Sequence, residues 1–96
     1  MRERDFQAHV IRRLKTAFPG AVVVKNDAGY LQGIPDLTVF FGNRWAMLEC
    51  KTSVTSPRQP NQEYYVELFN SMSYASFIYP ENEEAVFDEI QRAFRP

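Results

Sequence analysis

The chain has 96 residues, 45% of them hydrophobic and 15% aromatic, with a net charge of −1, which indicates one small domain, residues 1–96, with enough apolar residues for a core. The single cysteine, Cys50, and the single histidine, His9, exclude an intramolecular disulfide and a zinc site built from cysteines or from a histidine pair. Because one free cysteine suits a reducing compartment and no apolar run approaches the roughly 20 residues that cross a bilayer, we expect a cytoplasmic protein with no membrane partner.

The N-terminal third predicts a helix, a strand and a loop. Residues 3–18 carry apolar side chains at helical spacing, with charged residues on the opposite side; the apolar positions are Phe6, Val10, Ile11, Leu14, Ala17 and Phe18. Pro19-Gly20 ends this helix. Ala21–Val24 is a short β-branched run typical of a strand, and residues 26–33 contain two glycines, Asn26 and Asp27, which indicates a loop.

Two further strands are predicted at Asp36–Phe41 and Trp45–Lys51. The two residues between them, Gly42-Asn43, predict a hairpin, because glycine readily adopts the positive φ that a type II′ turn needs at its first position. Residues 52–60 hold two prolines and two serines and are expected to form a loop.

The remainder of the chain predicts a helix, a strand and a last helix. Gln62–Met72 places Tyr65, Leu68, Phe69 and Met72 on one helical face. Ala75–Tyr79 is a short apolar strand. After Pro80, Asn82 is expected to cap a C-terminal helix whose apolar positions are Val86, Phe87, Ile90 and Phe94. The predicted order is helix, strand, strand, strand, helix, strand, helix.

The hairpin register brings three ionisable residues together. If Gly42 and Asn43 form the loop, Asp36 lies directly opposite Glu49, and opposed residues have Cβ atoms roughly 4.5–5.5 Å apart on one face of the sheet. Glu49 and Lys51 are two residues apart on one strand, so they share that face. Two carboxylates this close repel each other, and a divalent cation between them makes the arrangement favourable.

Hard cations such as Mg²⁺ prefer oxygen ligands, and Mn²⁺ is expected to substitute. The predicted ligands are Asp36, Glu49 and the backbone carbonyl of Cys50. A metal there polarises a phosphodiester oxygen and lowers the pKa of a bound water. Lys51 would orient the attacking water or stabilise charge in the transition state.

Gly33-Ile34-Pro35-Asp36, followed 13 residues later by Glu49-Cys50-Lys51, resembles the signature of the PD-(D/E)XK nuclease superfamily. The resemblance covers about residues 3–80 and is closest to small VRR-NUC-type nucleases and Holliday-junction resolvases. It implies an α/β fold with a restriction-endonuclease-like αβββαβ core, in which helices flank a mixed sheet, here followed by a C-terminal helix. Taken alone, Asp36 also fits a turn residue and Glu49 with Lys51 a solvent-facing strand pair.

Three further residues match the family individually. Glu3 matches an acidic residue of the first helix that often contacts the metal or its water, and it shares a helical face with Phe6, Val10 and Leu14, so we expect it to point inward; its alternative is a first-turn acid favoured by the helix dipole. Lys25 matches a lysine that would meet a phosphate, and Gln62 a glutamine that opens the helix after the E-x-K motif. The chain departs from the family at residues 70–74, where a glycine commonly follows that helix.

The charge distribution gives a weaker indication of DNA binding. Residues 1–60 hold nine of the eleven Lys and Arg residues and five acids, whereas residues 61–96 hold two and seven. The basic half would face phosphates, or both halves are ordinary solvated surfaces. Arg12 and Arg13 are by default a solvated helix face and secondarily a phosphate track. His9 is expected on the surface without a partner, and Trp45, Tyr64 and Tyr65 in the core or an interface rather than stacking on bases.

These patterns favour a metal-dependent endonuclease that hydrolyses DNA phosphodiester bonds, with a preference for branched or structured DNA implied by the resemblance. A homodimer is expected, because so small a chain offers little surface for gripping a duplex and the resolvases act as symmetric pairs. The alternative is a catalytically silent nuclease-fold DNA-binding module, or a partner-dependent subunit of a larger restriction or recombination assembly.

Overall fold

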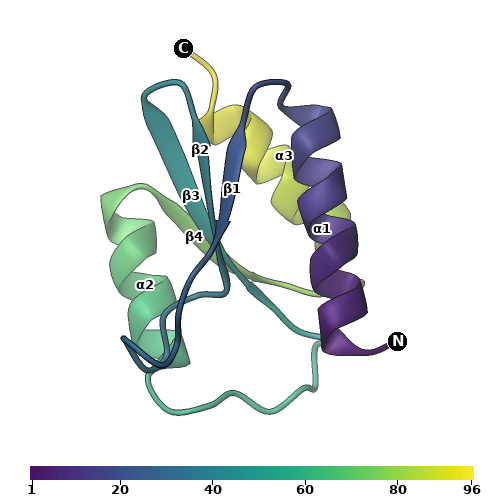
Figure 1. Cartoon of the computed structure of the whole chain (residues 1–96), viewed down its shortest axis with the longest axis vertical. Helices are drawn as coiled ribbons and strands as arrows, with labels where there is room; N and C mark the ends of the chain where they lie inside the picture. Colours follow the sequence, from purple (N-terminus) through teal and green to yellow (C-terminus); the bar gives the residue numbers. More distant parts are fainter.

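A computed structural model describes all 96 residues and has the predicted order of elements (Figure 1). The predicted bounds differ from those of the structure by one residue at most. The elements are α1 (Glu3–Ala17), β1 (Val22–Lys25), β2 (Leu37–Phe41), β3 (Arg44–Cys50), α2 (Gln62–Met72), β4 (Tyr74–Ile78) and α3 (Glu83–Ala93). None of the three helices combines the length and the apolar character that a membrane span requires.

The strands form one mixed sheet in the order β1-β2-β3-β4. β1 pairs antiparallel with β2, β2 pairs antiparallel with β3, and β3 pairs parallel with β4. The parallel pair needs a crossover between its strands, and α2 provides it. The predicted α/β class with a mixed sheet, flanking helices and a C-terminal helix is therefore confirmed.

The β2–β3 hairpin has the predicted register, with Phe41 opposite Arg44 and Val39 opposite Ala46. Gly42 has a φ of +62°, whereas Asn43 is not among the residues with positive φ, which agrees with the turn chemistry expected for a type II′ loop. This register decides which side chains of β2 and β3 meet at the far end of the hairpin.

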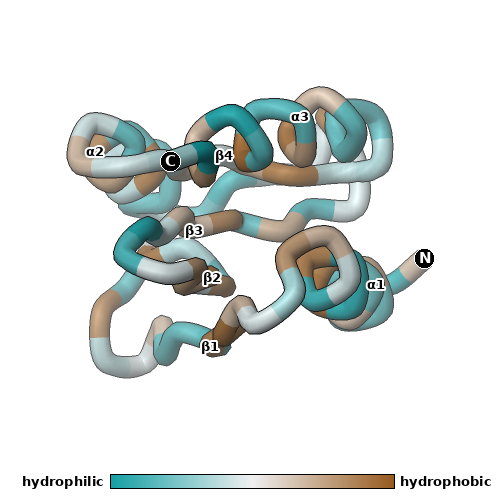
Figure 2. The backbone as a smooth tube through the Cα atoms, turned by 90° about the horizontal axis from the view of Figure 1, so that it is seen from above, coloured by the Kyte–Doolittle hydropathy of each residue, from teal (hydrophilic) through white to brown (hydrophobic).

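The helices cover the two faces of the sheet unequally (Figure 2). α1 and α3 cover one face and enclose the larger apolar cluster of 14 buried residues, which includes the fully buried Leu14, Leu37 and Leu48. Burying each such leucine contributes about 1.5–3 kcal/mol. α2 covers the other face only over β3 and β4, where Val66, Ala75 and Phe77 form a second, smaller cluster. No helix lies over β1 and β2 on that face.

The turn from α2 to β4 forms without a glycine, at the point where the sequence departs from the nuclease pattern. Ser73 alone separates the two elements, with an extended φ of −148°. The side chain of Asn70 accepts a hydrogen bond from Ala75 N–H over 3.1 Å, and the Ser73 hydroxyl donates to the carbonyl of Trp45. Polar side chains therefore secure this turn in place of a left-handed residue.

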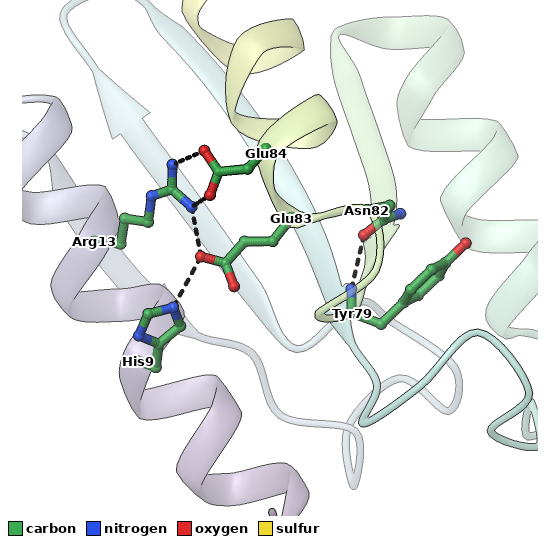
Figure 3. Close-up of polar contacts among 6 residues, drawn as sticks. All are labelled: His9, Arg13, Tyr79, Asn82, Glu83 and Glu84. Carbon is green, nitrogen blue, oxygen red and sulfur yellow. Dashed lines mark hydrogen bonds and ion pairs between the residues drawn. The ribbon is translucent and has the colours of Figure 1, made fainter.

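Asn82 stands at the N-cap position of α3, as predicted, but its side chain does not cap the helix. The side-chain oxygen instead accepts a hydrogen bond from Tyr79 N–H over 2.8 Å (Figure 3), and its amide donates to the carbonyl of Phe77 over 3.0 Å. The predicted capping bond is wrong because Asn82 turns back to satisfy backbone groups at the end of β4.

Candidate active site

Asp36 directly precedes β2, and the register that pairs Leu37 with Leu48 places it level with Glu49 at the end of the hairpin. Its side-chain oxygen Oδ2 accepts a hydrogen bond from Cys50 N–H over 2.9 Å. This bond satisfies a backbone donor at the end of β3 and fixes one oxygen of Asp36 beside the Glu49 carboxyl. The two acids that sequence reasoning paired are thus adjacent in the fold.

Asn26 holds the backbone around Asp36 in place, and sequence reasoning assigned it only to a loop. Its N–H donates to the carbonyl of Asp36 over 2.8 Å, continuing the β1–β2 pairing by one residue. Its side-chain amide donates to the carbonyl of Pro35 over 2.9 Å and to the hydroxyl of Thr38 over 2.8 Å. The end of β1 therefore fixes the segment that carries the first acid.

Glu49 is the most deeply buried carboxylic acid of the chain, at 1% exposure. Its Oε2 accepts a hydrogen bond from the Gln62 amide over 3.0 Å. Its Oε1 is fully buried and has no hydrogen-bond partner. Burial, and then the negative charge of Asp36, raise the pKa of Glu49 to about 8, because both disfavour the charged form.

Burial also raises the pKa of Asp36, while the hydrogen bond from Cys50 N–H opposes that shift. The pair therefore holds one proton near neutral pH, since two neighbouring buried carboxylates do not both ionise readily. An unpartnered buried oxygen and a shared proton are costly features for a structural pair. Their presence together points to a ligand that carries positive charge.

Lys51 follows β3 and extends its pairing with β4, because its N–H donates to the carbonyl of Ile78 over 2.9 Å. The side chain is buried, and its Nζ lies 3.8 Å from Glu49 Oε2. Nζ donates one hydrogen bond, to the carbonyl of Pro57 over 3.1 Å. Two of its three donor positions are therefore uncommitted beside the carboxylate pair.

Gln62, predicted as a DNA contact, lies inside this cluster as the first residue of α2. Its amide donates to Glu49, and its side-chain oxygen accepts Gln59 N–H over 2.8 Å. A close approach of two loops places it there: a Cβ on Gly33 would lie 2.6 Å from the Cβ of Asn61. Gly33 has a φ of +92° and Asn61 a φ of +71°, so the glycine of the G-I-P-D motif lets the preceding loop pack against the start of α2.

Glu3 does not point inward as predicted. The side chain is exposed and forms no hydrogen bond or ion pair, because the first buried residue of α1 is Phe6, almost one turn later. The charge of Glu3 nevertheless contributes to raising the pKa of Glu49 and of the Cys50 thiol. Glu3 therefore belongs to the electrostatic surroundings of the cluster without being packed into it.

The basic residues predicted to contact DNA fall into two groups. Lys25 and Arg12 are exposed, and their side chains form no ion pair. Arg13 is instead held by α3: its guanidinium donates to Glu83 and to both carboxylate oxygens of Glu84, the longest of these bonds being 2.7 Å (Figure 3). It also lies 4.1 Å above the centre of the Phe87 ring.

Arg13 therefore joins α1 to α3, and its place in a phosphate track stays a prediction. His9 also has a partner, contrary to expectation, since its Nε2 lies 2.8 Å from Glu83 Oε2 (Figure 3). Charged residues about 70 positions apart in the sequence meet here because α1 and α3 lie side by side on one face of the sheet (Figure 1).

No three side chains among the His, Cys, Asp and Glu residues form a ready-made metal site. Mg²⁺, however, is commonly bound by one or two carboxylates together with substrate phosphates and several waters. Asp36 and Glu49 fit that requirement, because Glu49 Oε1 is a buried acceptor without a partner and a second carboxylate, that of Asp36, lies beside it.

No protein-family model matches this chain, and no curated protein or solved structure is significantly similar to it. The function of the chain is therefore inferred from the geometry of Asp36, Glu49, Lys51 and Gln62.

Proposed function

We propose that this chain is a metal-dependent DNA endonuclease of the PD-(D/E)XK type, with a restriction-endonuclease-like αβββαβ core. One observation carries the proposal: the buried Glu49 keeps an unpartnered oxygen beside Asp36, with the uncommitted donors of Lys51 on the same face of the sheet. A purely structural site would be more stable with apolar side chains at these positions.

Asp36 and Glu49 would hold Mg²⁺ or Mn²⁺, with the Cys50 carbonyl as a further oxygen ligand. The exposed Glu3 would act on the metal through a water. The metal would polarise the phosphodiester and lower the pKa of a bound water. The hydrogen bond from Cys50 N–H fixes Asp36, and that from Gln62 fixes Glu49, so that both carboxylates are oriented before substrate arrives.

Lys51 would act on the reacting phosphate. Its ammonium is anchored by Pro57 and keeps two donors, with which it can orient the attacking water or stabilise the charge that develops on a phosphate oxygen. Its burial strengthens these interactions because little water competes for the charge.

We propose branched or structured DNA as the substrate and a symmetric pair of chains as the acting form. One chain measures only 34 × 27 × 21 Å, so a second copy would enlarge the surface that contacts the DNA. Gel filtration of the protein with and without a four-way junction tests the pairing.

The decisive experiment is cleavage of end-labelled four-way junction, flap and linear duplex DNA with Mg²⁺ or Mn²⁺. Glu49→Gln and Lys51→Ala should reduce the rate by at least about 100-fold. Glu67→Gln, which changes an exposed acid of α2, is the matched control and should cut like wild type. If the folded wild type cuts none of these substrates with either metal, the proposal that the chain is a nuclease active on its own is wrong.

A further inference from the structure

A second feature of the molecule lies on the sheet face that α2 leaves partly open. A groove of about 400 Å³ is lined by Asn26, Thr38, Phe40, Trp45, Met47, Phe69 and Met72. We call these seven residues the aromatic groove. The β2–β3 register sets Thr38 against Met47 and Phe40 against Trp45, so four of the residues form two cross-strand pairs on its floor, while Phe69 and Met72 of α2 form a wall.

The aromatic groove exposes apolar surface that the fold does not use. Phe40 is 45% exposed and Met72 is 63% exposed. The ring of Phe69 meets Trp45 edge-on, with 6.3 Å between the ring centres. No charged side chain lines the groove, so it suits a flat, uncharged group with a polar edge better than a phosphate or a peptide side chain with charge.

One end of the aromatic groove reaches the candidate active site. Asn26 and Thr38, its two polar residues, belong to the hydrogen-bond network that fixes Pro35 and Asp36. Lys25, next to Asn26 in the chain, is exposed and free to meet a phosphate outside the groove. A strand with its phosphates along this rim could place bases in the groove while its backbone passes Asp36.

We propose that the aromatic groove binds unpaired bases of single-stranded DNA next to the phosphate to be cut. This inference rests on the proposed nuclease function and narrows its substrate to DNA with an unpaired segment at the cleavage site. Bases stack on aromatic side chains in sequence-tolerant single-strand binding, whereas a duplex keeps its bases stacked inside and presents sugar and phosphate to a protein surface.

A second copy of the chain is a poorer occupant. A two-fold contact places the same patch of both copies face to face, so the groove would meet a groove and leave a hollow between the copies. A stable interface also buries about 800 Å² on each partner, from some 20–30 residues, whereas this feature comprises seven residues.

Trp45 is the only tryptophan of the chain and therefore reports directly on the groove. Its fluorescence would be titrated with oligothymidylate, and with a blunt DNA hairpin, in EDTA so that no cleavage occurs. We expect quenching by the single strand at lower concentration than by the duplex. Phe40→Ala and, separately, Met72→Ala should weaken single-strand binding about tenfold. Val54→Ala, which changes an exposed apolar residue outside the groove, should not.

Circular dichroism and thermal melting would establish that each variant is folded, and the exposed position of Met72 makes its truncation safe for the fold. Unchanged affinity in both groove variants, or binding without any change in Trp45 fluorescence, would overturn the inference even if the wild type cleaves DNA. A Trp45 signal that changes with protein concentration alone, together with dimerisation lost in Phe40→Ala, would also overturn it by showing that a second copy fills the groove.

The same variants keep the two proposals apart. Quenching that depends on Phe40 and Met72, in a protein that cuts no DNA, would support the base-binding groove and contradict the nuclease. Cleavage of duplex and single-stranded substrates at equal rates in wild type and both variants would support the nuclease and contradict the groove.

Discussion

The amide of Gln62 donates a hydrogen bond to Glu49 Oε2 over 3.0 Å, which links the first residue of α2 to the C-terminal end of β3. The contact leaves Glu49 Oε1 as the unpartnered oxygen. Gln62 therefore selects which oxygen of the buried acid remains available to a ligand.

Gln62→Ala should reduce the cleavage rate about 10- to 100-fold, because the residue that orients a metal ligand is lost. Removing a donor to the charged form also raises the pKa of Glu49 further, so the rising limb of the pH–rate profile should move to higher pH. Measuring that profile with wild type, Gln62→Ala and the control Glu67→Ala checks this. A lower rate with an unmoved pH profile would mean that Gln62 does not act through Glu49.

Gly33→Ala should destabilise the protein and displace α2 from the site. Gly20 and Gly33 have nearly the same φ, +90° and +92°, but a Cβ on Gly20 meets nothing within 4 Å whereas one on Gly33 would lie 2.6 Å from Asn61. Gly20→Ala therefore measures the backbone cost alone, about 1–2 kcal/mol. Urea unfolding should show a larger loss of unfolding free energy for Gly33→Ala than for Gly20→Ala. Equal losses would mean that the loop can move away from α2 without destabilising the protein.

The free energy of unfolding should fall as pH rises from about 4.5 to about 8. The folded protein holds the proton of Glu49 up to a pKa of about 8, whereas the unfolded chain releases it near the ordinary value of 4.5. The stabilisation is therefore complete below 4.5 and is lost as pH rises through 8. Glu49→Gln should flatten this dependence in urea unfolding with EDTA present. If the free energy of unfolding depends on pH in the same way in wild type and Glu49→Gln, Glu49 ionises normally.

Arg13→Ala should lower the free energy of unfolding by about 1–2 kcal/mol, because it leaves the mostly buried Glu83 with His9 as its remaining partner and removes the contact with Phe87. Arg12→Ala, one residue earlier and exposed, is the matched control and should unfold like wild type. Thermal melting and DNA-binding assays on both variants separate the roles. A loss of DNA affinity in Arg13→Ala without a loss of stability would show that Arg13 contacts DNA and is not needed to hold α1 against α3.

The order of elements and the hairpin register could be predicted because they depend on local patterns. Helical periodicity, a β-branched run and Gly42-Asn43 act over a few residues, and the hairpin register then places Asp36, Glu49 and Lys51 together by arithmetic. The same reasoning wrongly predicted that Glu3 points inward. Periodicity shows the face of a helix on which a residue lies, but not whether the core extends as far as that residue.

Contacts between distant elements could not be predicted. The bonds from His9 and Arg13 to Glu83 depend on how α1 and α3 pack, and no local pattern specifies that packing. The contact of Gln62 with Glu49 depends on Gly33, whose close approach to Asn61 becomes visible only once both loops are folded. The glycine of the G-I-P-D motif was the one available signal, since glycine often marks a close approach of two backbones.

The hydrogen bond between Asp36 and Cys50 N–H has a consequence for engineering this chain. Asp36 satisfies a backbone donor that the sheet would otherwise leave open, whereas Glu49 brings a buried oxygen that nothing satisfies. A designer who selected for thermostability alone would keep the first acid and replace the second with an apolar residue. Selection for thermostability would therefore discard the site by removing Glu49 alone, while Asp36 stays in place.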